Sequence, residues 1–247
     1  MAKRSRILLA LSAFLCGGAF GLAGQVIGLP VRNAGIPTGI SIAADLGFRN
    51  ADAGKGNAYA LTGTLGLGPL GASVTVGRFS PADCAFNCDV VDGVNTVGAT
   101  ANIQMFGGPL VPLTVTLQAG ASRSSIVGRS GLPDAGVIDS VRRLHVPVGV
   151  GFALTIPSPV FSIRPWVAPR IDALRTTGTR TFSGNTMSGS SSESISQTDV
   201  RFGLSAGVDL GLLSGLGFRV AYDRVKVRGT SPSIISVGAS FAFKVGL

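Results

Sequence analysis

Charged side chains are scarce in this 247-residue chain, at 13% of the residues. Lysine and arginine outnumber aspartate and glutamate by 21 to 12, but the basic residues are scattered and form no block. Proteins that bind nucleic acid gather their basic residues on one face or helix. We therefore expect no nucleic-acid partner, and a mildly basic surface suits anionic lipid headgroups better.

Residues that bind metals or drive catalysis are also rare. The chain has one histidine, His145, one glutamate, Glu193, and three cysteines. A zinc site needs three or four ligands, drawn mostly from histidine and cysteine. We therefore predict neither a metal site nor a cofactor.

Long hydrophobic runs are missing beyond the first two dozen residues, although the mean hydropathy of +0.45 is high. A membrane-spanning helix needs about 20 consecutive apolar residues. Here the apolar residues instead alternate with small and polar ones, and glycine is common, with 36 residues. Alternation with a period of two is typical of β-strands, including those that cross a membrane as a closed barrel.

The N-terminal segment has the three parts of a secretory signal peptide. Lys3, Arg4 and Arg6 are its basic start, an apolar stretch follows over 7–20, and 21–23 offer a small-residue cleavage site. We therefore predict a signal peptide over 1–24, a periplasmic lead-in over 25–37 and one β domain over 38–247.

The last fourteen residues, 234–247, alternate apolar residues with small or polar ones. Gly238, Phe241 and Phe243 lie in this stretch, and Leu247 ends the chain. The stretch resembles the C-terminal insertion signal of small outer-membrane β-barrel proteins of diderm bacteria. The resemblance implies an all-β, antiparallel, up-and-down transmembrane barrel in the bacterial outer membrane. It also implies that the barrel-assembly machinery recognises the last strand, and that outer-membrane lipid surrounds the barrel.

The same alternation divides 38–247 into about ten predicted strands, or eight if the third or seventh is misread. Connections after the second, fourth, sixth and eighth strands are short, and those after the first, third, fifth and seventh are longer, as in outer-membrane barrels. Pro165 and Pro169 fall within the seventh strand and predict a bulge or bend, because proline cannot donate to the ladder. The longest connection is expected over 176–198 and is rich in serine, threonine and glycine.

Charged residues fall consistently on the face opposite the apolar one. An arginine or lysine facing mid-membrane lipid costs about 2–4 kcal/mol, so these residues are expected to line the lumen. The predicted lumen charges are Asp45, Arg164, Arg170, Asp172, Arg201, Asp209, Arg219, Asp223 and Lys244. They are compatible with a polar plug that holds the barrel together. They are also compatible with a narrow channel that is weakly selective for anions.

Cys84 and Cys88 share one predicted loop in an oxidising compartment, which favours a disulfide between them. His145 is expected near the rim of the sixth strand. Barrel enzymes such as omptin proteases place a histidine beside an acidic partner, but the omptin His-x-Asp pattern would need an acid where Pro147 stands. Ser140 and Asp139 are alternative neighbours of His145, and their spacing does not support a site.

The sequence therefore favours a non-enzymatic, monomeric barrel that stabilises the membrane or presents its loops outside. A narrow passive channel for small, possibly anionic solutes is the alternative function, and a rim-site hydrolase is a third.

Overall fold

The structure is a computed structural model that describes residues 39–50, 55–81, 93–108, 111–126, 137–182, 191–226 and 232–243. Ten long antiparallel strands form a closed barrel, as predicted, and an eleventh element is a strand of two residues. The ten long strands are β1 (Gly39–Asn50), β2 (Gly56–Leu67), β3 (Leu70–Pro81), β4 (Val94–Gly108), β5 (Val111–Ile126), β6 (Val137–Leu154), β8 (Phe161–Phe182), β9 (Ser191–Leu212), β10 (Leu216–Val225) and β11 (Ser233–Phe243).

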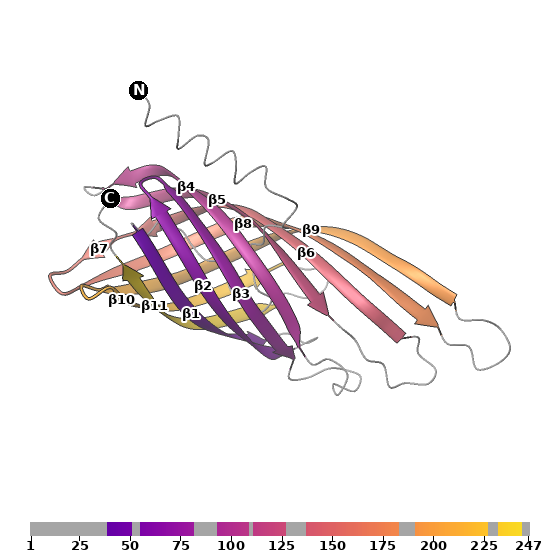
Figure 1. The fold of residues 1–247 in the computed structure, drawn as a ribbon. Coiled ribbons are helices and arrows are strands. Elements are labelled where there is room, and N and C mark those ends of the chain that lie inside the picture. Colours follow the sequence, from indigo (N-terminus) through magenta and orange to yellow (C-terminus); the bar gives the residue numbers. More distant parts are fainter. Residues whose placement is uncertain are drawn as a thin grey trace, which may run out of the picture.

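Each long strand pairs with the long strands before and after it in the chain, and one further pairing, between the first and the last strand, closes the ring. The C-terminal strand β11 pairs with β1 from Ile40↔Phe243 to Asn50↔Ser233. The two-residue β7 (Ile156–Pro157) continues β6, and β6 pairs directly with β8. In Figure 1, β6, β8 and β9 extend past the other strands at one end of the barrel. Every long strand therefore has two neighbours, and no long strand is left as an edge.

The outer face of the barrel is apolar. Along β1 the exposed residues are Ile40, Ile42, Ala44, Leu46 and Phe48, while Ala43, Asp45 and Gly47 face inward. The same two-residue period gives each strand one apolar outer row, because successive side chains point to opposite faces. Large exposed residues such as Phe202, Phe218 and Phe241 lie on this surface, which is that of a barrel embedded in lipid. None of the described segments forms a helix that is long and apolar enough to cross a membrane.

Connections alternate in length between the two ends of the barrel, as predicted. Gly68 has a positive φ of 61° in the tight turn between β2 and β3, and Gly215 has one of 86° between β9 and β10. Ser158 donates its backbone N–H to the carbonyl of Phe161 at 2.9 Å in the turn that leads into β8. These turns share one end of the barrel, and the longer connections lie at the other, which is the extracellular end in barrels of this type.

The connection expected over 176–198 is largely strand, which corrects that prediction. β8 extends to Phe182 and β9 begins at Ser191, and the two pair continuously from Phe161↔Leu212 to Phe182↔Ser191. Serine and threonine suggested a loop by composition, but threonine is also a good strand former. The pairing of two long strands satisfies the backbone N–H and C=O groups that face each other. This gain outweighs the local preference of serine and glycine for a loop conformation.

The two prolines of β8 produce no bulge, which corrects the first of the two predicted alternatives, a bulge or a bend. The ladder to β9 runs through Pro165↔Val208 and Pro169↔Leu204 without a shift. On the other side, the pairs with β6 are interrupted between Gly149↔Arg170 and Phe152↔Val167, and the register is the same on both sides of the gap. Proline has no backbone N–H to donate, and the interrupted pairs indicate that the missing donors face β6. The ladder to β9 is therefore intact. The register shifts of the barrel lie instead in β4 and at the start of β6.

Several predicted features lie outside the described residues. They are the signal peptide, the lead-in, Cys84, Cys88, Lys244 and Leu247. Within the insertion signal, Phe241 and Phe243 lie on the outer face of β11 with ring centroids 4.8 Å apart, and Gly238 lies on the inner face.

Candidate functional site

The inner face of the barrel is polar, but its two halves differ. On β2 to β5 many of the inward side chains are serine and threonine, and several of them bond across neighbouring strands. Thr62 and Thr75 are 2.8 Å apart, Thr96 and Ser124 are 2.8 Å apart, and Ser73 bonds to Thr100. The inward side chains of β6, β8, β9 and β10 include most of the long charged residues. These longer side chains therefore have room to extend toward the small ones opposite.

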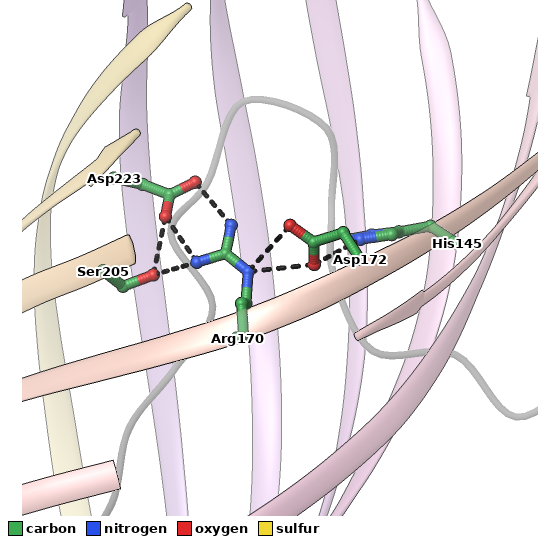
Figure 2. A network of polar contacts seen from close by, with 5 residues as sticks. All are labelled: His145, Arg170, Asp172, Ser205 and Asp223. Carbon is green, nitrogen blue, oxygen red and sulfur yellow. Dashed lines mark hydrogen bonds and ion pairs between the residues drawn. The ribbon is translucent and has the colours of Figure 1, made fainter. Parts of the chain in front are cut away.

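Arg170 on β8 is at the centre of this candidate site. Its Nη1 and Nη2 donate to the two carboxylate oxygens of Asp223 on β10, at 2.7 and 3.0 Å. Its Nε lies 2.9 and 3.1 Å from the two oxygens of Asp172, two residues along the same strand. Ser205 on β9 bonds to both Arg170 and Asp223. Figure 2 shows the guanidinium held between the two carboxylates.

His145 on β6 extends this network to a fourth strand. Its Nε2 lies 2.9 Å from Oδ1 of Asp172, and the two side chains are aligned in Figure 2. The sequence analysis placed His145 at the rim without a partner, and Asp172 is the partner that it missed. The two residues are 27 positions apart, and they meet because Pro147 on β6 is paired with Asp172 on β8. No local spacing pattern could reveal this contact.

Burial makes the network energetically significant. Arg170, Asp172 and Asp223 are each exposed by 2% or less. A buried charge that loses its partner typically destabilises a protein by about 3–5 kcal/mol. Here one arginine neutralises two carboxylates and His145 supports one of them, so the four ionisable groups depend on one another.

A second row of charges follows the strand register nearer the tight turns. Arg164 on β8 is paired in the ladder with Asp209 on β9, which is paired with Arg219 on β10. Nε of Arg219 lies 2.6 Å from Oδ1 of Asp209. Gly238 on β11 is the ladder partner of both Arg219 and Asp45, so the row continues to β1. Opposite charges thus alternate along this row on four of five adjacent strands, with Gly238 between Arg219 and Asp45.

A third group of charges lies on the extracellular side of the Arg170 network. Arg49 on β1, Arg143 on β6 and Arg201 on β9 are close enough for Arg143 and Arg201 to act electrostatically on Arg49. Arg201 also acts on Arg143 and is paired with Asp199 at 2.9 Å. These three inward arginines, with one described carboxylate beside them, are called the positive ring below.

A small cavity lies beside the Arg170 network. A cavity of about 10 Å³ is lined by Arg170, by Thr100 on β4 and by Gln118 on β5, together with Pro147 and Gly149 on β6. That volume holds about one water molecule. Both amide atoms of the buried Gln118 have no hydrogen-bond partner within the protein, so a water molecule there would satisfy them.

The structure places eight of the nine predicted lumen charges on the inner face, and Lys244 lies outside the described residues. Arg170, Asp172 and Asp223 meet in one network, and Arg164, Asp209 and Arg219 meet in another. Sequence reasoning missed Arg49, Arg143 and Asp199. Strand parity could have found the two arginines, because Arg49 lies two residues after the inward Gly47 and Arg143 lies two before His145.

Two features of the site bear on metal binding and hydrolysis. Among the described residues, no three His, Cys, Asp or Glu side chains are grouped so as to hold a metal ion. His145 and Asp172 have the geometry of an orienting pair, but Arg170 already binds both oxygens of that carboxylate. The network is better suited to structural cohesion than to proton transfer.

Comparisons with known proteins find solved structures that are weakly similar to the chain. Neither a protein-family model nor a curated protein matches the chain. The translocator domain of the autotransporter NalP from Neisseria meningitidis is 14% identical, with 97% of this chain and 95% of that chain covered and a TM-score of 0.43. Neisserial surface protein A is 12% identical, with 83% and 98% covered and a TM-score of 0.38. The Escherichia coli outer-membrane protease OmpT is 11% identical, with 83% and 95% covered and a TM-score of 0.40. The fold assignment rests on the closed ring of strand pairs and the apolar exterior.

Proposed function

We propose, from the premise that this chain is a small outer-membrane β-barrel protein, that it is a closed and non-enzymatic barrel that presents its longer connections at the cell surface. The observation that carries this proposal is the position of Arg170. Its guanidinium is bonded to Asp172 and Asp223, and together with Thr100 and Gln118 it lines a cavity that holds about one water molecule.

A lumen filled in this way resists the passage of solutes. Barrels of about eight strands have interiors that side chains can fill, whereas porins with 16–18 strands keep an open aqueous channel. This barrel has ten strands, close to eight, so we expect its side chains to fill most of the interior. To open the lumen, the buried arginine would have to move away from two buried carboxylates. Such an open state is high in free energy, because it leaves buried charges without partners.

Conductance of the refolded protein in a planar lipid bilayer tests the proposal. We expect no discrete current steps from wild-type protein whose folding is verified by a shift in gel migration between boiled and unboiled samples. The variant Arg224→Ala, which removes an exposed arginine from the outer face of β10, serves as the control and should be equally silent. Discrete steps from the wild type that change in Arg170→Ala would overturn the closed-barrel proposal.

The positive ring favours one alternative, a narrow channel for small anions. Arg49, Arg143 and Arg201 would concentrate anions at the extracellular mouth, as clefts lined by one sign of charge do. If the wild type conducts, this alternative predicts anion selectivity that decreases in Arg201→Ala. Silence of the well-folded wild type excludes it.

A further inference from the structure

The outer surface carries a row of polar residues where the apolar band ends on the extracellular side. On each strand, the first polar residue beyond the apolar or aromatic ones is an arginine or an uncharged residue. These residues are Asn50, Asn57, Arg78, Asn95, Arg123, Arg142, Arg175, Thr198, Arg224 and Ser233. The carboxylates whose side chains the structure describes, Asp45, Asp172, Asp199, Asp209 and Asp223, all belong to the inner face. The charge of this outer boundary is therefore of one sign on the described strands.

Three of these arginines lie together on adjacent strands. Arg123 on β5 is paired in the ladder with Leu144 on β6, and Leu144 is paired with Arg175 on β8. Arg142 lies two residues from Leu144 on the same outward face, and all three arginines are exposed. With strands about 4.8 Å apart and a rise of about 3.3 Å per residue, the Cα atoms of Arg123 and Arg175 are about 10 Å apart, and that of Arg142 is about 7 Å from Leu144.

We propose that Arg123, Arg142 and Arg175, the β5–β8 arginine cluster, bind the phosphate groups of an anionic lipid in the extracellular leaflet. Guanidinium groups bind phosphate through two parallel hydrogen bonds, and three of them around one position can hold a headgroup with more than one phosphate. This site lies on the outside of the barrel and is independent of the proposal that the lumen is closed.

The surroundings of the cluster select a lipid over a free anion. Leu144, in the middle of the cluster, is 39% exposed, and below it on the same outer row β6 presents Val148 and Phe152. On β8 the exposed Ile171 and Val167 continue the apolar surface. A ligand that satisfies both features has a phosphate-bearing head at the level of the arginines and hydrocarbon chains along the barrel wall.

Lipid retention in nanodiscs provides the test. Wild-type protein is folded into phosphatidylcholine nanodiscs that contain a minor share of phosphorylated lipid A or of its dephosphorylated form, and retained lipid is counted by native mass spectrometry after mild extraction. Two double variants each remove two positive charges from exposed positions near this boundary. R142Q/R175Q lies within the cluster, and R224Q/K226Q lies away from it, with Arg224 on β10 and Lys226 just after it. Gel migration before and after boiling verifies that both are folded.

We expect wild type and R224Q/K226Q to retain phosphorylated lipid A equally and the dephosphorylated form poorly. R142Q/R175Q should lose about tenfold in retention for each arginine, because each one would remove charge-assisted hydrogen bonds to the phosphate groups. Equal losses in the two double variants would show a diffuse surface effect and overturn the proposed site. Displacement of the lipid by millimolar inorganic phosphate would also overturn it, because the site would then recognise a free anion.

Discussion

Arg170 and Asp223 form a two-point ion pair that passes over β9, with Nη1 2.7 Å from Oδ1 and Nη2 3.0 Å from Oδ2. Neither side chain is exposed to solvent. Their strands are not neighbours, so the pair connects β8 to β10 in addition to the backbone ladders of β9. Through Asp172 and His145 the connection reaches β6, which makes this network a tie across four adjacent strands.

Replacing Arg170 by alanine should destabilise the barrel strongly. The substitution leaves two buried carboxylates without their main partner, so we expect a loss of about 3–5 kcal/mol in the free energy of unfolding. Urea unfolding of protein folded into phosphatidylcholine vesicles measures this. Arg224→Ala, an exposed arginine on β10, should change stability by no more than about 0.5 kcal/mol. A similar small change for Arg170→Ala would mean that the two carboxylates find other partners.

Gly207→Ala should disturb the packing of the only tryptophan. A Cβ at Gly207 on β9 would lie 2.7 Å from Cζ2 of Trp166 and 2.7 Å from the carbonyl oxygen of Val220. Forcing a methyl group into such a site costs about 1–3 kcal/mol. Since the chain has one tryptophan, its emission spectrum should shift in the folded variant.

The matched control for that variant is Gly63→Ala on the outer face of β2. A Cβ at Gly63 meets no atom within 4 Å, so the methyl group faces open space. Stability and tryptophan emission should both stay at wild-type values. An unchanged emission spectrum for Gly207→Ala as well would show that Trp166 is not held against Gly207.

Much of the barrel was predictable because it rests on the two-residue period alone. Parity along each strand indicated which residues face lipid, and an aspartate or arginine among alternating apolar residues marked the inner face. The contacts between strands were not predictable in this way. Arg170 and Asp223 are 53 residues apart, and their contact depends on the register of β8 with β9 and of β9 with β10. One sequence carries no direct signal of such registers.

The extent of β8 and β9 shows a second limit of sequence reasoning. Thr177, Gly178 and Thr179 look like loop residues by composition, yet they pair with Ser196, Ile195 and Ser194. Two strands that pair along their whole length satisfy the backbone groups that face each other. Serine and glycine, which are weak strand formers, therefore remain extended here. Composition reports local preference and misses this mutual support.

His145→Ala tests the non-enzymatic part of the proposed function. Asp172 would lose its bond to His145 but keep Arg170, so we expect a loss of about 1.5–3 kcal/mol in unfolding free energy, smaller than that for Arg170→Ala. His145→Gln retains a donor and should recover part of the stability. Hydrolysis of phospholipid and peptide substrates should be the same in wild type and variant. A hydrolytic activity of the wild type that disappears in His145→Ala would contradict the proposal.

Asp209 and Arg219 should show a favourable coupling energy in a double-mutant cycle. Asp209 faces Arg219 on one side and Arg164 on the other along the ladder, and it also accepts a hydrogen bond from Nε1 of Trp166 at 3.2 Å. Asp209→Asn leaves the two arginines repelling each other, whereas Arg219→Gln still leaves the carboxylate facing Arg164. We therefore expect Asp209→Asn to cost more stability than Arg219→Gln.

In the double variant D209N/R219Q that repulsion is absent, so its loss of stability should be smaller than the sum of the two single losses. Neighbouring charged residues typically couple by about 0.5–3 kcal/mol, and partial exposure places this pair near the lower end. Urea unfolding of the four proteins in the same vesicles gives the coupling energy, and Ser73→Ala, in a hydroxyl pair on β3, controls for removal of an inward polar group. If the two single losses simply add, the charged side chains of this row stabilise the barrel independently of one another.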